Sequence, residues 1–359
     1  MDSLVLEALT INSHKGPYIV HFVDRILSSP QPWFGDDRHF IIDSNVAKIY
    51  RTELKPVLAH PNTITIEASE DAKSLDQIAP IIEQLVKHQV RRNHHLVAIG
   101  GGVTQDITCF IASVLLRGID WDFIPTTLLA QADSCIGSKS SINVGKAKNI
   151  VGTFYPPQTI WIDTALLASL GDSEIRSGIG EILKVHAIDS PESFDHVASD
   201  YESMMTDKEV LHKHIRNSLE IKKRFIEIDE FDTGIRNIFN FGHSFGHAIE
   251  TATNFGVPHG IAVTMGMDIA CQISYARGTL PAEQLNRMRP GLRKNYLGFD
   301  NVEIPLDAMF SALMKDKKNS TTMLGLILPI GNRSIIERIE VAPNEEFRNQ
   351  LTDALSSLA

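Results

Sequence analysis

The segment NFGHSFGHAIE, residues 240–250, carries two histidines, His243 and His247, that are four residues apart. Residues with this spacing lie on one face of a helix, one turn apart. A third histidine, His259, follows in the sequence VPHG. Two or three imidazoles with one carboxylate would suit Zn²⁺ with an open coordination position. The zinc-protease pattern HExxH is absent, because Ser244 stands where its glutamate would be, so a structural role for the pair stays open.

Three glycines, Gly100 to Gly102, end the apolar run 95–100 and precede Asp106. Glycines at the end of a parallel strand let the backbone approach a pyrophosphate, which then faces amide groups and a helix N-terminus. The spacing is not GxGxxG, and a tight turn without a ligand is the alternative. Nucleotide binding and a ligand-free turn are both compatible with this motif alone.

Lysines recur in a polar segment, residues 124–149, that has little periodicity and includes Lys139 and Lys148. Such a segment inside a compact domain predicts a functional loop, and its lysines suit phosphate or carboxylate groups. Further along, GEILK places Glu181 and Lys184 three apart on one helical face. A surface ion pair is the alternative for these two residues.

Arg236 and Asn240 are four apart, just before the first histidine. If this stretch is helical, both lie on a face that leads to the histidines. A guanidinium binds a carboxylate bidentately, so we expect Arg236 to bind a substrate carboxylate with Lys222 assisting. A surface ion pair of Arg236 with Asp229 or Asp232, worth about 0–1 kcal/mol, is the alternative.

The bulk composition narrows the class of protein. The chain has 359 residues, 43% of them hydrophobic, which is enough for about two domains. Its net charge of −10 argues against a general binder of nucleic acid or of anionic membranes, but a site can still be locally basic. The three cysteines show no CxxC pairing, which fits a reducing compartment. No apolar run is long enough for a membrane span, and the N-terminal region lacks the basic residues of a secretory signal, so we expect a cytosolic protein.

Short β-branched runs alternate with helical patterns in the first 165 residues, which predicts a mostly parallel sheet covered on both faces. The runs cover residues 39–44, 62–67, 95–100, 121–127 and 159–164. A helix with Leu75, Ile78, Ile82 and Leu85 on one stripe is expected between the second and third, although Pro80 interrupts its pattern. Beyond residue 165 helical patterns dominate, and only residues 324–331 resemble a strand. We therefore expect an α/β domain over 1–165 and a mainly α-helical domain over 166–359.

Taken together, GGGVTQD, LLRG, PTTLLAQADSCIGSK, GEILK, RNIFNFGHSFGHAIE with the later HG, and DKK resemble 3-dehydroquinate synthase and, more broadly, the sugar phosphate cyclases. The resemblance runs from about Asp43 to about Ile330. It implies an N-terminal Rossmann-like NAD-binding domain followed by a mainly α-helical metal-binding domain. It also implies a homodimer and a role in aromatic amino acid biosynthesis.

The implied reaction converts 3-deoxy-D-arabino-heptulosonate 7-phosphate to 3-dehydroquinate and phosphate. It proceeds by transient oxidation with NAD⁺, phosphate elimination and intramolecular aldol closure, with Zn²⁺ or Co²⁺ as a Lewis acid. The implied metal ligands are Glu181, His243 and His259, which gives His247 a proton-transfer or substrate-contacting role. The implied substrate contacts are Arg117, Asp133, Lys139, Asn149, Lys184, Lys222, Arg236, Asn240, His247, Lys317 and Lys318. The implied NAD contacts are Asp43, Asn45, Glu70, Lys73, Gly101, Gly102, Asp106, Thr126, Thr127 and Lys148.

Three positions depart from the family pattern. Gln105 replaces a small residue, Ala147 replaces a glycine before Lys148, and Ile261 replaces a glutamate after the HG. A sibling cyclase of the amino-dehydroquinate, 2-deoxy-scyllo-inosose or valiolone type is therefore an alternative, although Arg236 and Asn240 favour a carboxylate-bearing substrate. An iron-type or glycerol-type alcohol dehydrogenase and a non-catalytic NAD-binding paralogue are the remaining alternatives.

Overall fold

A computed structural model describes residues 5–28, 33–145, 147–315, 319–320 and 322–358. The chain forms two compact units, each described here by itself. The N-terminal unit is Met1–Leu170 together with Lys223–Phe231, and the C-terminal unit is Gly171–Lys222 together with Asp232–Ala359. The second segment of the N-terminal unit begins in the last part of a long helix, and the expected division at residue 165 placed it in the other domain. No helix among the described residues is both long and apolar enough to cross a membrane.

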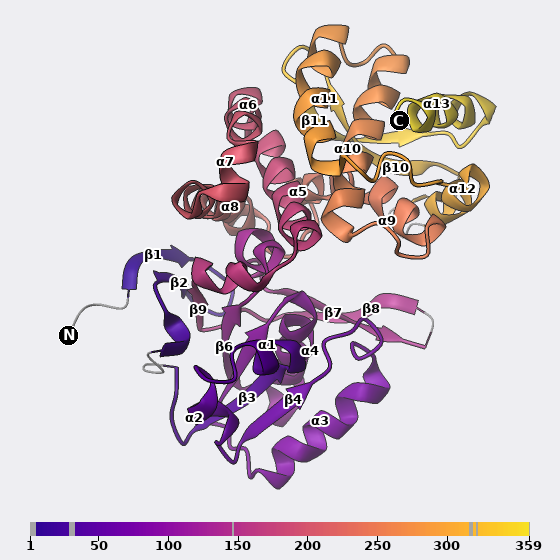
Figure 1. Cartoon of the computed structure of the whole chain (residues 1–359). Coiled ribbons are helices and arrows are strands. Elements are labelled where there is room, and N and C mark those ends of the chain that lie inside the picture. Colours follow the sequence, from indigo (N-terminus) through magenta and orange to yellow (C-terminus); the bar gives the residue numbers. More distant parts are fainter. Residues whose placement is uncertain (1–4, 29–32, 146, 316–318, 321, 359) are drawn as a thin grey trace. The chain divides into compact units, whose positions relative to one another are not determined.

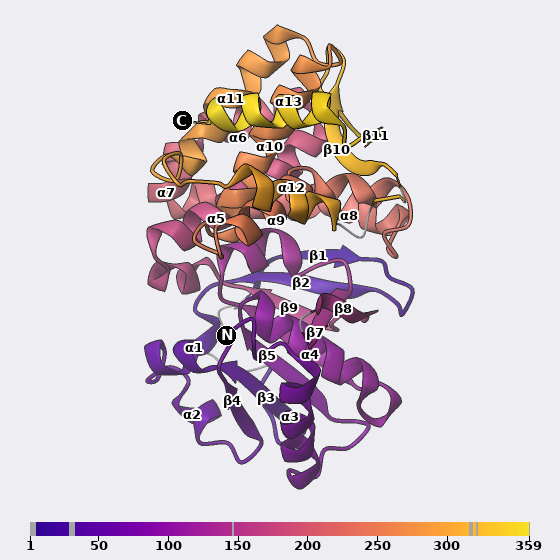
Figure 2. The same cartoon turned by 90° about the vertical axis from the view of Figure 1, so that its right-hand side faces the viewer.

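The N-terminal unit is built on a seven-stranded sheet in the order β1-β2-β9-β6-β5-β3-β4 (Figures 1 and 2). All neighbouring strands pair in parallel except β1 and β2, which pair antiparallel. The five expected strands are confirmed, while β1 and β2 were not expected. In sheet order the strands are β1 (Val5–Ile11), β2 (Tyr18–Val23), β9 (Thr159–Ile162), β6 (Asp120–Pro125), β5 (His95–Gly100), β3 (Arg38–Asp43) and β4 (Thr63–Ile66).

Four α-helices connect these strands: α1 (Ser44–Ile49), α2 (Lys55–Leu58), α3 (Leu75–Lys87) and α4 (Gly102–Val114). Helix α3 continues through Pro80, whose side chain is exposed. The buried stripe of α3 is Ile78, Ile81 and Leu85, whereas Leu75 is exposed, so the expected stripe was wrong at Leu75 and Ile82.

The polar segment 124–149 is more regular than the expected loop. It contains a π-helical turn, Ala130–Ser134, followed by an antiparallel hairpin of β7 (Lys139–Val144) and β8 (Ala147–Phe154). Both strands contain β-branched residues, and Gly145 adopts a φ of +56° at the turn, a conformation that favours glycine. The segment therefore has a defined backbone that can hold its polar side chains in place.

The C-terminal unit is mainly helical, which confirms the expected fold class of a Rossmann-like domain followed by a helical one. Its elements are α5 (Asp172–Asp189), α6 (Pro191–Ser199), α7 (Tyr201–Thr206), most of α8 (Lys208–Ile228), the 3₁₀-helix η5 (Ile235–Asn240), α9 (His243–Ala252), α10 (His259–Ala276), α11 (Ala282–Tyr296), α12 (Leu306–Met314) and α13 (Glu345–Ser356). A hairpin of β10 (Leu324–Ile330) and β11 (Ile335–Val341) completes it. We expected β10 but missed β11.

Helix α10 lies at the centre of this unit and packs against α5, α9, α11 and α13 (Figure 1). Glycines bring its backbone into direct contact with two neighbours. A Cβ atom on Gly180 of α5 would collide with the backbone oxygen of Gly260, and a Cβ atom on Gly266 of α10 would collide with that of Gly242. Buried hydrogen bonds fix the first contact, because Gly260 N donates to Ser177 Oγ at 2.8 Å.

Replacing Gly266 tests this packing. A Gly→Ala change inside a helix normally stabilises it by up to about 1 kcal/mol. Here the new methyl group has no room, so we expect Gly266→Ala to lower the free energy of unfolding by about 1–3 kcal/mol. Urea unfolding of the metal-free protein measures the change.

Gly102→Ala is the matched control, because Gly102 is the first residue of α4 and its added Cβ would meet nothing closer than Ser134 Oγ at 3.9 Å. Without a collision, alanine in this helix should leave the stability unchanged or raise it by up to about 1 kcal/mol. A Gly266→Ala protein as stable as the native one would contradict the close packing.

Candidate active site

A carboxylate and three imidazoles meet in the C-terminal unit. Glu181 lies on α5 and is 1% exposed. His243 and His259 are the first residues of α9 and α10, and their Nε2 atoms lie 3.6 Å and 3.4 Å from Glu181 Oε1. His247 stands one turn after His243, and ring nitrogens of the three histidines lie within 4.8 Å of one another.

Each of these four residues is next to a glycine in the sequence. Gly180 precedes Glu181, Gly242 precedes His243, Gly246 precedes His247, and Gly260 follows His259. Added Cβ atoms at all four glycines would meet backbone atoms of a neighbouring helix at 3.0 Å or less. The close helix contacts described above therefore set the separation of the site residues directly.

A second carboxylate, Glu250, adds to the negative charge of the site. Its Oε1 lies 3.2 Å from His259 Nδ1. Burial lowers the pKa of His259, but the hydrogen bonds and charges of Glu181 and Glu250 outweigh it and raise that pKa to about 10. Sequence reasoning missed Glu250, although it stands seven residues after His243 and so lies on the same face of α9.

This donor set fits a divalent cation. A buried carboxylate and imidazole nitrogens are the ligands that Zn²⁺ and Co²⁺ accept, and two acidic groups beside one imidazole favour a positive charge. The expected ligand set of Glu181, His243 and His259 is compatible with these distances, and so is a set that includes His247. The choice between the two sets stays a prediction.

Lys184 is nearly fully buried and forms an ion pair with Glu181 Oε2, so the alternative of a surface ion pair does not describe these residues. Its Nζ atom also lies 5.8 Å from the centre of the Phe239 ring. A buried ammonium group held by one carboxylate has a fixed position, which suits a lysine that must present a proton or a positive charge to a ligand.

Arg236 is also buried, at 5% exposure, which contradicts the alternative of a solvent-exposed ion pair. It lies on η5, and in a 3₁₀-helix residues three apart are eclipsed, so Arg236 and Asn240 do not share a face as an α-helix would place them. Asn240 Nδ2 donates to Asn237 O at 2.9 Å. Lys222 is buried as well, while Lys317 and Lys318 lie outside the described residues.

In the N-terminal unit, the expected nucleotide contacts gather at the carboxyl edge of the sheet. Gly100 ends β5 and accepts a hydrogen bond from Thr126 N at 2.9 Å, after the end of β6. Gly101 caps α4, and a Cβ atom there would lie 2.9 Å from Thr127 Cγ2. Ligands of parallel α/β sheets bind at this edge, where the N-terminus of α4 favours an anion. Asp43 and Asn45 lie at the end of the neighbouring strand β3.

A polar network holds the β7–β8 hairpin beside this edge. Lys73 Nζ donates to Asp106 Oδ2 at 3.0 Å and to Asn149 Oδ1 at 2.9 Å. Asn143 accepts from Asn149 N at 2.8 Å and donates to Glu70 Oε1 at 2.9 Å. Burial raises the pKa of Asp106, while the charge of Lys73 opposes that rise. Four of these residues were expected to contact NAD or substrate, whereas Asn143 was missed.

The remaining expected contacts of the N-terminal unit lie in three places. Asp133 is buried in the π-helical turn, and Lys139 and Lys148 are exposed on the hairpin. Arg117 is exposed in the turn between α4 and the start of β6, at the amino edge of the sheet. A six-residue strand is about 17 Å long, so Arg117 lies apart from the glycine-rich turn of its own unit.

The departure at Gln105 has a structural explanation. Gln105 Nε2 donates to Ser134 O at 2.6 Å, and Ser134 Oγ donates to Gln105 Oε1 at 2.9 Å. The side chain therefore ties α4 to the π-helical turn that carries Asp133. Nothing in the structure explains Ile261 as a replacement for a glutamate beyond its full burial in α10.

Two sequence profiles of one family match consecutive parts of the chain. The profile described as 3-dehydroquinate synthase N-terminal matches residues 63–177, and that described as 3-dehydroquinate synthase C-terminal matches residues 178–319. A curated 3-dehydroquinate synthase from Alkaliphilus metalliredigens (strain QYMF) is 34% identical over 346 residues, which are 95% of this chain and 97% of that protein.

Solved structures of cyclases share the fold. The 2-epi-5-epi-valiolone synthase from Streptomyces hygroscopicus subsp. jinggangensis 5008, with NAD⁺ and Zn²⁺ bound, is 28% identical with a TM-score of 0.81, covering 95% of this chain and 96% of that one. A 2-deoxy-scyllo-inosose synthase complexed with carbaglucose-6-phosphate, NAD⁺ and Co²⁺ is 23% identical with a TM-score of 0.82, covering 97% and 100%. At that lower identity the likeness shows the fold alone.

Replacing Asn143 tests the polar network. Asn143→Ala removes the bonds to Asn149 and Glu70, so we expect a loss of about 1–3 kcal/mol of stability, the cost of leaving buried polar groups without partners. Amide hydrogen exchange at Asn149 and along β8 should become faster. Asn301→Ala, which removes the same side chain from an exposed position, should leave both quantities unchanged. Unchanged exchange in the hairpin of Asn143→Ala would contradict the role of the network.

Proposed function

Since the chain belongs to the 3-dehydroquinate synthase family, as its motifs predicted, we propose that it converts 3-deoxy-D-arabino-heptulosonate 7-phosphate to 3-dehydroquinate and phosphate. It is a phosphate-eliminating cyclase of the 3-dehydroquinate synthase type. Membership of this family separates it from the alcohol dehydrogenases considered as an alternative. The group of buried Glu181 and Lys184 with the partly exposed His243 and His259 is the observation that carries the proposal, because it unites a candidate cation site and a fixed ammonium group.

Both cofactors have fitting residues. NAD⁺ would lie at the carboxyl edge of the sheet, with its pyrophosphate at Gly101 and Gly102, and a divalent metal such as Zn²⁺ would be held by Glu181, His243 and His259. When bound, NAD⁺ supplies a hydride acceptor that is regenerated in each turnover, and the metal supplies a Lewis acid for a substrate oxygen. Asp43, Asn45, Glu70, Lys73, Asp106, Thr126, Thr127 and Lys148 are the other proposed NAD contacts.

The chain's own side chains bind and orient the substrate. Arg236 would take the carboxylate with Asn240 and Lys222, because a rigid guanidinium fork matches two carboxylate oxygens. Lys139 and Asn149 of the hairpin, with Lys317 or Lys318, would lie nearer the phosphate. His247, which is exposed and one turn from His243, would exchange a proton with a substrate hydroxyl through its ring nitrogen. Asp133 and Lys184 complete the proposed contacts.

We propose further that the enzyme is a cytoplasmic homodimer whose active sites each take Arg117 from the partner. Arg117 is expected to bind substrate, yet within its own unit it lies at the edge of the sheet opposite to the glycine-rich turn. A second copy related by two-fold symmetry would let this exposed arginine serve the partner's site.

Phosphate release tests the reaction. Purified protein with Zn²⁺ and an amount of NAD⁺ far below that of the heptulosonate phosphate should release phosphate over many turnovers, while the absorbance of NADH stays flat. Omitting NAD⁺ should stop the release. Build-up of NADH in proportion to product would contradict the proposal in favour of a net oxidation.

Substrate choice is tested at Arg236. Arg236→Lys should lower kcat/KM for the heptulosonate phosphate by about tenfold to a hundredfold, because a hydrogen bond to a charged group contributes roughly 1.5–3 kcal/mol. Thermal stability should change little. Arg216→Lys, at a half-exposed position on α8, is the matched control and should keep full activity. Equal losses on an analogue without the carboxylate would show that Arg236 does not recognise that group.

Shared active sites are tested by mixing two inactive variants. Arg117→Ala and Glu181→Gln should each have little activity alone, but co-expression should restore about one quarter of the native activity, because half of randomly formed dimers would contain one complete site. If Arg117 serves its own subunit, no dimer in the mixture has a complete site. No recovery in verified heterodimers would then contradict the shared site.

A further inference from the structure

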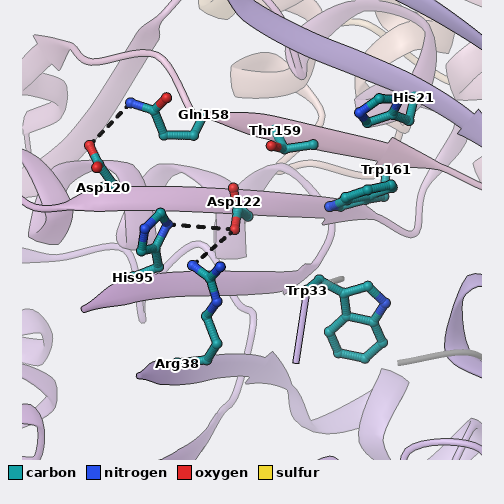
Figure 3. Close-up of a pocket in the computed structure, with 9 residues that line it drawn as sticks. All are labelled: His21, Trp33, Arg38, His95, Asp120, Asp122, Gln158, Thr159 and Trp161. Carbon is teal, nitrogen blue, oxygen red and sulfur yellow. Dashed lines mark hydrogen bonds and ion pairs between the residues drawn. The ribbon is translucent and has the colours of Figure 1, made fainter. Parts of the chain in front are cut away.

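A pocket of about 340 Å³ opens in the N-terminal unit at the amino edge of the sheet (Figure 3). Arg38, His95 and Thr159 stand at the starts of β3, β5 and β9, and Trp33 closes one side. The proposed NAD site lies at the opposite ends of the same strands, about 17 Å away. We call this feature the amino-edge pocket. Its volume lies in the range of small-molecule sites, and none of the proposed active-site residues lines it.

Strand register places the lining side chains on one face of the sheet. Arg38 pairs with His95 across β3 and β5, and His21 pairs with Trp161 across β2 and β9. Asp122 of β6 pairs with Thr159, two residues before Trp161. Since side chains in register point to the same side and alternate along a strand, these residues lie on one face of the sheet across five strands (Figure 3).

Several buried nitrogen atoms of residues that line the amino-edge pocket have no hydrogen-bond partner among the residues that the structure describes. They include the indole nitrogens of Trp33 and Trp161, whose side chains are 1% and 5% exposed, and Nη1 of Arg38. The Nδ1 atoms of His21 and His95 also have no hydrogen-bond partner among these residues. The indole and guanidinium groups can only donate, so a partner must offer acceptors. Buried donors without partners cost free energy, which an acceptor-bearing ligand would recover.

Arg38 has ion-pair partners, but none of those among the described residues is close enough for a hydrogen bond, which leaves donors of its guanidinium available to a ligand. The Nε atom of Arg38 lies 3.6 Å from Asp37 Oδ1. Nη1 of Arg38 lies 3.6 Å from Asp122 Oδ2, and His95 Nδ1 lies 3.7 Å from the same oxygen, so both contacts are ion pairs too long for hydrogen bonds. Burial raises the pKa of Asp122 to about 6, although the charge of Arg38 lowers it. Hydrogen bonds from Thr159 also lower that pKa, so Asp122 is mostly ionised at neutral pH and would share the guanidinium with a ligand.

The walls of the amino-edge pocket favour a flat ligand. The ring of His21 stacks on Trp161 with 4.6 Å between centroids and 23° between planes, and Trp33 stands beside them (Figure 3). Aromatic faces of this kind bind a further ring by stacking. A phosphate dianion would meet the carboxyl group of Asp122, whereas a single carboxylate carries less charge and matches one guanidinium.

We propose that the amino-edge pocket binds a small aromatic or cyclic carboxylic acid, whose carboxylate accepts a hydrogen bond from Arg38 while its ring lies against Trp161 and Trp33. No residue proposed for the active site lines this pocket, and the proposal does not depend on the active-site chemistry.

Tryptophan fluorescence gives a direct test with benzoate as the probe. Two of the three tryptophans line the pocket, and the third, Trp121, donates to Tyr155 O instead. Titration of the full-length protein, saturated with NAD⁺ and Zn²⁺, should give a saturable change with a dissociation constant of about 1 mM, as expected for a fragment. Benzamide, which has the same shape without the charge, should bind at least tenfold more weakly.

Variants of Arg38 test whether benzoate binds in the amino-edge pocket or elsewhere on the protein. Arg38→Met should weaken benzoate binding at least tenfold. If this variant folds poorly because Asp122 is left without its partner, the double variant Arg38→Met with Asp122→Asn removes that carboxylate and should show the same loss of binding. Arg333→Met, an exposed arginine of the C-terminal unit, should bind as the native protein does. The proposal is overturned if the fluorescence shows no saturable change with benzoate, which would mean that the pocket holds only water. It is also overturned if benzamide binds as well as benzoate, or if Arg38→Met binds benzoate as the native protein does.

Discussion

The approach of helix backbones at glycine residues is the constraint on which the C-terminal unit depends. Gly180 and Gly260 bring α5 against α10, and Gly246 and Gly266 bring α9 against α10, at separations that no Cβ atom would allow. Each contact stands next to a residue of the candidate site in the sequence. The site geometry is therefore a consequence of helix packing, and its precision comes from rigid helices and not from loops.

Several charged side chains of the C-terminal unit are buried, where water screens their charges little. Lys184 and Glu181 form a buried ion pair, and Arg236 and Lys222 are buried as well. Burying such groups costs free energy that close partners offset only in part, so their positions indicate function more than stability. Under the proposed function, these buried cations would give a chain with a net charge of −10 local positive charge for an anionic substrate.

The sequence predicted what depends on local pattern. Near-continuous apolar runs marked the central strands, and the histidine spacing together with GEILK marked the candidate metal site. It did not predict Asn143 or Glu250, because their roles depend on partners that folding brings close. It also missed β11, although the segment Ile335–Val341 is rich in β-branched residues, and it assigned a loop where β7 and β8 pair. The 3₁₀ geometry of η5 could not be read from the spacing of Arg236 and Asn240, which suits an α-helix equally well.

Anomalous scattering from crystals grown with Zn²⁺ tests the central claim most directly, since it locates the ion independently of activity. The account predicts one strong peak about 2.0–2.2 Å from an oxygen of Glu181 and from a ring nitrogen of His243 and of His259. Chelation should remove the peak and stop phosphate release together. An ion held by His243 and His247 with Glu181 remote, or an ion bound only at the group of His196, Asp200 and His214, would contradict it.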